Sequence, residues 1–152
     1  MDAIKLQCDL LRELRKALGG LGSMHEMRSE YYYIANVKGT ALYRIPVYAW
    51  YLSENVFSAP AGISKTIVEM CQLAGDDLPL QKTGLIKEHG KEKYHVLAFE
   101  DGDNVYLDVK LASYFSDGVK YFKTKKPGMI KCVEYGEVVA LIGEFIFKEG
   151  AK

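Results

Sequence analysis

The feature that most constrains the fold is a segment near the end of the chain that is apolar on both faces. Residues 138–142 read Val-Val-Ala-Leu-Ile, without a polar side chain. Successive side chains of a strand point to opposite faces of a sheet, so such a strand is stable only when both faces are covered. The segment therefore predicts a packed domain and excludes a linker or a tail.

Short strand-like runs separated by two-residue turns occupy most of the chain. A turn whose second residue is glycine between two alternating runs is typical of a β-hairpin. Three such hairpins are predicted, at 31–37 with 40–48, 80–88 with 93–100, and 119–125 with 129–134. Two more strands are expected at 104–107 and 137–147. A largely antiparallel sheet follows from this pattern.

Three helices are also expected. The clearest covers residues 3–18, with Asp2 as its N-terminal cap and a buried stripe of Ile4, Cys8, Leu11, Leu14 and Leu18. A second is predicted over 60–74 and a short third over 108–115. The predicted fold class is α+β: a single domain over 1–152, in which an N-terminal helix and a largely antiparallel sheet pack with two further helices. Its parts are the N-terminal helix (1–20), a tyrosine-rich hairpin (31–52), and a helix, strands, helix and three strands (58–147).

Composition narrows the class of protein. The 152 residues carry 20 basic and 20 acidic side chains, and this balance disfavours a dedicated nucleic-acid binder. The three cysteines are far apart, which suggests reduced thiols in a reducing compartment. The start of the chain does not resemble a signal peptide, and the longest apolar run, residues 45–52, is too short for a bilayer. We expect a cytoplasmic protein that does not enter a membrane.

The sequence carries no complete motif for catalysis, a cofactor or a metal. Residues 62–66, Gly-Ile-Ser-Lys-Thr, resemble the end of a phosphate-binding loop, but Ala59 and Ser64 stand where its glycines would be needed. The acidic stretch 100–104 lacks the closing glutamate of a calcium loop. A thiol–imidazole pair, His95 with Cys71 or Cys132, is the one open route to enzyme chemistry. We therefore expect no cofactor, no metal and, on balance, no enzyme.

A lysine-rich hairpin is one candidate for binding. It contains four closely spaced cations, Lys120, Lys123, Lys125 and Lys126. Basic side chains interleaved with aromatic ones can follow a phosphate backbone and stack on bases. Strand alternation divides these lysines between two faces, however, and lysines at a sheet edge also prevent aggregation. A solvated edge is the favoured interpretation, and contact with a polyanion is the alternative.

An aromatic-rich region is the stronger candidate. Five of its residues are predicted to supply an interface: Tyr31, Tyr32, Tyr33, Trp50 and Tyr51. Tyrosine and tryptophan give a large contact area at low entropic cost. Three consecutive tyrosines cannot all face one core, because neighbours alternate across the sheet. This region predicts a homo-oligomer or a protein partner.

The element order from residue 58 onward resembles a known family. Residues 105–115, Val-Tyr-Leu-Asp-Val-Lys-Leu-Ala-Ser-Tyr-Phe, are followed by a hairpin and the apolar strand 138–147. This order is similar to one repeat of a DNA sliding clamp, a polymerase processivity factor, over residues 58–147. The resemblance implies a clamp-like topology and assigns no site residues.

The function predicted first is therefore a non-enzymatic interaction module that self-associates or binds a protein partner through the tyrosine-rich hairpin. A nucleic-acid-associated accessory protein, clamp-like or in contact with a polyanion, is the second hypothesis. A small-molecule sensor or cysteine-dependent enzyme is the third.

Overall fold

The computed structural model describes residues 1–16, 25–28, 30–51, 78–100, 102–124 and 128–147. The described strands are β1 (His25–Arg28), β2 (Tyr31–Ala35), β3 (Ala41–Pro46), β4 (Leu78–His89), β5 (Glu92–Ala98), β6 (Asn104–Asp108), β7 (Lys120–Lys123), β8 (Met129–Glu134) and β9 (Glu137–Gly143). The described residues also form the α-helix α1 (Ala3–Lys16), which precedes the strands, and the 3-10 helix η1 (Val47–Ala49), which follows β3.

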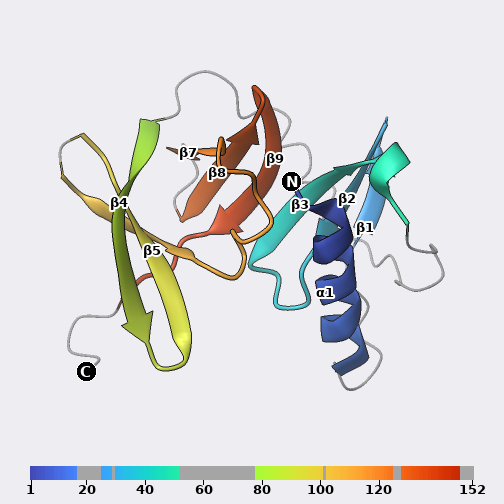
Figure 1. Cartoon of the computed structure of the whole chain (residues 1–152), viewed down its shortest axis with the longest axis horizontal. Helices are drawn as coiled ribbons and strands as arrows, with labels where there is room; N and C mark the ends of the chain where they lie inside the picture. Colours follow the sequence, from blue (N-terminus) through green and yellow to red (C-terminus); the bar gives the residue numbers. More distant parts are fainter. Residues whose placement is uncertain (17–24, 29, 52–77, 101, 125–127, 148–152) are drawn as a thin grey trace.

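The nine strands form one sheet in the order β1-β2-β3-β9-β8-β7-β4-β5-β6, and every neighbouring pair is antiparallel. Strands β1–β3 and β4–β6 lie at opposite sides of the molecule, with β7–β9 between them (Figure 1). The three predicted hairpins are confirmed as β2–β3, β4–β5 and β7–β8. Gly39 turns the first of them with φ +70°, a conformation that suits glycine.

The apolar strand β9 lies between β3 and β8, and both of its faces are covered. Ala140 and Ile142 belong to the main core cluster, together with Tyr43 and Ile45. Leu141, which points the other way, packs in a second cluster with buried residues of β2 and β3, namely Tyr33, Ala35 and Leu42. The prediction that this strand is covered on both faces is confirmed.

Helix α1 starts as predicted but buries a different stripe. Asp2 Oδ1 accepts a hydrogen bond from the backbone N of Lys5 at 3.0 Å, which is a helix cap. Of the side chains that the structure describes in α1, Leu6, Gln7 and Leu10 are buried, whereas Ile4 is 61% exposed. Cys8, also expected inside, is exposed. The buried face of the helix includes Gln7 because the Gln7 amide forms hydrogen bonds with distant backbone groups, as described below.

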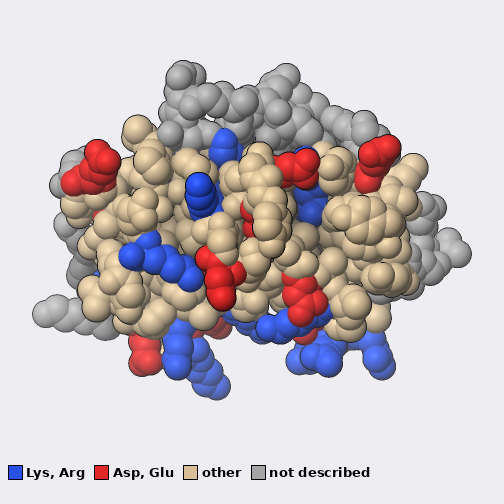
Figure 2. All heavy atoms as spheres, turned by 45° about the horizontal axis from the view of Figure 1, so that its top comes forward, with Lys and Arg blue, Asp and Glu red and all other residues tan. Residues whose placement is uncertain are grey.

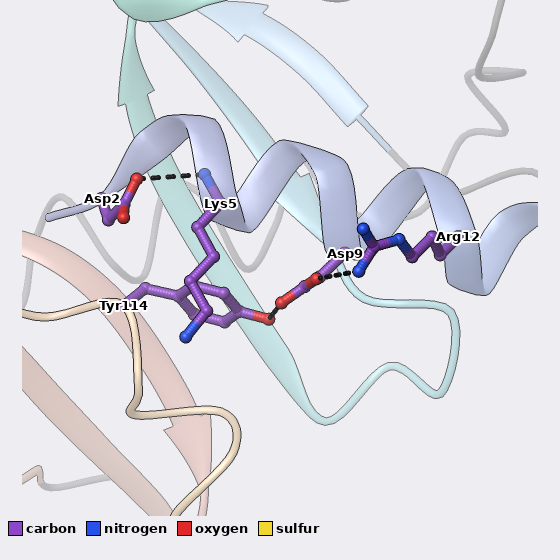
Figure 3. Close-up of polar contacts among 5 residues, drawn as sticks. All are labelled: Asp2, Lys5, Asp9, Arg12 and Tyr114. Atoms are coloured by element: carbon purple, nitrogen blue, oxygen red, sulfur yellow. Dashed lines mark hydrogen bonds and ion pairs between the residues drawn. The ribbon is translucent and has the colours of Figure 1, made fainter.

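The C-terminal half holds α1 in place through Tyr114. The Tyr114 hydroxyl donates to Asp9 Oδ2 at 2.8 Å, and the Lys5 ammonium lies 5.5 Å from the centre of its ring (Figure 3). The backbone N of Asp2 also donates to the Tyr114 carbonyl at 2.7 Å. Arg12 completes this edge with an exposed ion pair to Asp9 at 3.4 Å.

The predicted α+β class with three helices is wrong. Within the described residues the structure is mostly an antiparallel sheet with one α-helix, α1. The helix expected over 60–74 lies outside the described residues. The one expected over 108–115 is a series of turns.

Tertiary hydrogen bonds explain why 108–115 does not become a helix. Asp108 Oδ1 accepts from the backbone N of Lys110, as a cap would. The carbonyl of Leu111, which a helix would pair with Phe115 N, instead accepts the Tyr43 hydroxyl at 2.7 Å. Phe115 N bonds Ala112 O instead, at 3.4 Å. A hydroxyl from a distant strand thus binds the carbonyl at which the helical pairing stops.

Candidate functional site

A group of exposed apolar side chains lines a hollow of about 540 Å³ at the β1–β3 end of the sheet. We call it the aromatic hollow. It is lined by Met27, Glu30, Tyr31, Pro46, Val47, Tyr48 and Glu137. Met27 is 56% exposed and Tyr48 is 85% exposed. Large apolar side chains grouped on a surface in this way mark a binding site more often than isolated ones do.

Local backbone structure explains why Tyr48 projects. Strand β3 ends at Pro46, and η1 follows immediately, so the strand alternation stops there. The backbone N of Val47 donates to the Glu30 carbonyl at 2.9 Å, which fastens the start of η1 to the β1–β2 connection. Val47, the first residue of η1, is 42% exposed. The turn therefore presents Val47 and Tyr48 outward, beside Glu30.

One wall of the aromatic hollow already holds a cation. The Arg44 guanidinium lies 4.1 Å from the centre of the Tyr31 ring. Its Nη2 also lies 3.2 Å from Glu137 Oε2. The guanidinium is thus bound by a ring and a carboxylate that both line the hollow. Among the described side chains of this site, two are acidic, Glu30 and Glu137, and one is basic, Arg44, which leaves an excess of one negative charge.

The five predicted interface aromatics are divided among different places. Tyr31 lines the aromatic hollow. Tyr32 is buried and stacks on Trp50, with ring centres 4.3 Å apart. Tyr33 is buried in the second core cluster. Tyr51 is 69% exposed, but it is outside the lining of the hollow.

The position of Tyr51 is set by α1. Gln7 Oε1 accepts from the backbone N of Tyr51 at 2.8 Å, and Gln7 Nε2 donates to the Ala49 carbonyl at 2.8 Å. A single buried amide therefore fixes both ends of the segment that carries Trp50. The stacked pair of Tyr32 and Trp50 is not part of the lining of the hollow, and Trp50 packs against the main core cluster instead.

Sequence reasoning did not select the residues that give the hollow its exposed area. Tyr48 lies between Tyr33 and Trp50 in the sequence but is not among the five predicted interface residues, and neither is Met27. The available signal was Pro46, because a proline at the end of an alternating run predicts that the next residues leave the strand. Nothing in the sequence predicts that Glu30 lines the hollow, because its position depends on the hydrogen bond with Val47.

The four predicted polyanion contacts are not brought together by the described residues. Lys125 and Lys126 lie outside the described residues. Lys123 forms an ion pair with Glu144, which offsets its charge. Lys120 is exposed and lines a second hollow of about 500 Å³ that also contains Lys82 and Asp117. Basic and acidic side chains are interspersed over the visible face of the described residues (Figure 2).

The thiol–imidazole hypothesis has no geometric support from Cys132. Cys132 is on β8 and His95 is on β5, with β7 and β4 between them in the sheet. At about 4.8 Å per strand, this places the two backbones about 14 Å apart. Cys132 is fully buried, and burial raises the pKa of its thiol, which disfavours the reactive thiolate. Cys71 lies outside the described residues.

Two features are absent from the described residues. No three or more of their histidine, cysteine, aspartate and glutamate side chains are grouped so as to hold a metal ion. None of the helices in this part of the chain is long and apolar enough to cross a membrane.

Comparisons with known proteins do not add a candidate. No family model, no curated protein and no solved structure matches this chain. The resemblance to a sliding-clamp repeat therefore stays a prediction.

Proposed function

We propose that this chain is a protein-interaction module that binds a protein partner through the aromatic hollow. The observation that carries this proposal is the exposure of the Tyr48 ring, 85%, next to the half-exposed Met27 on the same hollow. Aromatic and methionine side chains are enriched at protein interfaces, and a buried tyrosine anchor often supplies much of the binding energy.

The chemistry of the lining supports binding over catalysis. Among the described residues that line the hollow there is no thiol, imidazole, ammonium or aliphatic hydroxyl. Its polar groups are the two phenols and the carboxylates of Glu30 and Glu137. Carboxylates at the rim of an apolar patch are suited to selecting a partner by charge.

The test compares two variants that each remove exposed apolar surface. Met27→Ser/Tyr48→Ser changes the hollow, and Leu85→Ser changes the β4–β5 hairpin, where Leu85 is 66% exposed. We expect wild type and Leu85→Ser to retain a partner in cross-linked affinity capture. We expect the purified partner to bind Met27→Ser/Tyr48→Ser about 30-fold more weakly, the loss of roughly one strong anchor.

The same variants also test whether a second copy of this chain, rather than a different protein, occupies the aromatic hollow. Sedimentation at increasing concentration would then show a dimer for wild type and Leu85→Ser, and a monomer for the double variant. Equal thermal melting of the three proteins is the control for folding. If the double variant keeps both its self-association and its partners, the aromatic hollow is not the interaction surface.

A further inference from the structure

We infer that the aromatic hollow receives an arginine side chain of the partner, held between the Tyr48 ring and the carboxylate of Glu30. This inference rests on the interaction role proposed above and adds the chemistry of the group that is recognised.

The first argument is that the protein already binds one guanidinium in this way. Arg44 stacks on Tyr31 at 4.1 Å and pairs with Glu137 at 3.2 Å, and both partners line the hollow. A guanidinium is planar, so it can stack on a ring and bond a carboxylate at its edge at the same time. The wall formed by Tyr31 and Glu137 is thus an internal example of such a site.

The second argument is that the lining of the hollow contains a second ring and a second carboxylate, Tyr48 and Glu30, to which no described cation is bound. Tyr48 and Glu30 are brought together by the backbone hydrogen bond between Val47 and Glu30. Among the described residues, every cation that lies over a ring uses a ring other than Tyr48. No described cation pairs with Glu30 either. As far as the described side chains go, one ring and one carboxylate of the hollow thus remain for an incoming group.

The third argument is the apolar part of the lining of the hollow. Met27 and Val47 are both partly exposed there. The long side chain of arginine covers apolar surface with its methylene groups while its charged end stays at a polar rim. Together with the excess negative charge, this combination favours arginine over a purely apolar side chain.

The probe for this inference is N-acetyl-arginine methylamide, and its control is the corresponding citrulline compound. Citrulline has nearly the same shape but no charge. We expect the arginine compound, at millimolar concentration, to shift the NMR signals of the Met27 methyl group and the Tyr48 ring. The citrulline compound should bind at least fivefold more weakly. Glu30→Gln should reduce arginine binding at least threefold, whereas Leu85→Ser should leave it unchanged.

The outcomes separate this inference from the proposed function. If both compounds bind wild type equally, or Glu30→Gln binds arginine like wild type, the hollow does not recognise the charge and the inference is wrong. The proposed function still stands in that case if Met27→Ser/Tyr48→Ser loses its partner. If arginine binds as expected but the double variant keeps every partner, the side-chain site stands and the proposed function falls.

Discussion

At the scale of single residues, the main structural ion pair involves Glu134. Its side chain is 2% exposed and lies 2.8 Å from the α-amino group of Met1. The backbone N of Ser116 also donates to Glu134 Oε2 at 2.7 Å. Burial acts to raise the pKa of Glu134, but the bonds from Met1 and Ser116 outweigh it, so the net pKa is lowered.

We predict that Glu134→Gln lowers the free energy of unfolding by about 3 kcal/mol at pH 7, because it leaves a buried amine without its counter-ion. The folded-state pKa lies below the unfolded value, so this contribution is complete above the unfolded pKa, about 4.3. It is lost as the pH falls through the folded pKa. Urea unfolding of both proteins between pH 7 and pH 2 measures the difference. A gap that stays the same at low pH would contradict the ionised pair.

Residues of this kind mark the limit of prediction from the sequence. Met1 and Glu134 are 133 positions apart, and no local pattern connects them. The same holds for Gln7, which is buried because its amide bonds the backbone of Ala49 and Tyr51. Apolar periodicity predicted that α1 exists, but it placed Ile4 and Cys8 inside, since it takes no account of a buried polar side chain with distant partners.

At the scale of elements, the hairpins could be predicted because their signals are local. Alternation and a glycine turn are adjacent in the sequence, as at Gly39, and they specify the pairing of the flanking strands. The turns at 108–115 could not be predicted, because their form depends on the Tyr43 hydroxyl. The lining of the hollow was predicted only in part for the same reason. Tyr31 is in a hairpin, which has a local signal, whereas Glu30 is placed by a contact with η1, which has none.

Strand β4 shows a second kind of element, a bulge. The pairing with β5 shifts between Lys82 and Ile86, and Gly84 there has φ +82°. The Thr83 hydroxyl donates to the Val96 carbonyl at 2.9 Å, which satisfies an acceptor opposite the bulge. Such a bulge bends the strand where it passes from β7 to the β5–β6 part of the sheet.

We predict that Gly84→Ala destabilises the protein by about 1 kcal/mol, because an L-residue is strained at this φ. A Cβ at Gly84 would meet no atom within 4 Å, so the cost is conformational and not steric. Gly118→Ala is the matched control, since its Cβ also has free space and its φ lies outside the left-handed region. Chemical denaturation measures both. Equal stabilities of the two variants would show that the bulge does not depend on glycine.

At the scale of the whole molecule, the two parts of the sheet are connected after β9 by an aromatic cluster. Phe145 stacks on Tyr94 of β5 with ring centres 4.3 Å apart, and its backbone N donates to the Tyr106 carbonyl of β6 at 3.0 Å. Phe147 packs on Phe145 at 4.7 Å and on Tyr106 at the same distance. The segment that follows β9 is thereby fixed to the β5–β6 part. Among the described residues, the backbone pairing that joins this part to β7 is limited to residues 78–80 of β4.

We therefore predict that Phe145→Ala lowers the free energy of local opening of β5, near Tyr94, more than that of β9. The lost packing corresponds to about 3 kcal/mol, the lower part of the range for removing a phenylalanine ring. Amide hydrogen exchange of Tyr94 and His95 should rise about 100-fold, while Leu141 and Ile142 should change much less, because β9 is paired on both edges and covered on both faces. Ile146→Ala is the control, since Ile146 is 70% exposed between the two phenylalanines and should alter neither region. If Phe145→Ala accelerates exchange equally at all four amides, the sheet opens as one cooperative unit, and the cluster adds to global stability without holding one part to the other.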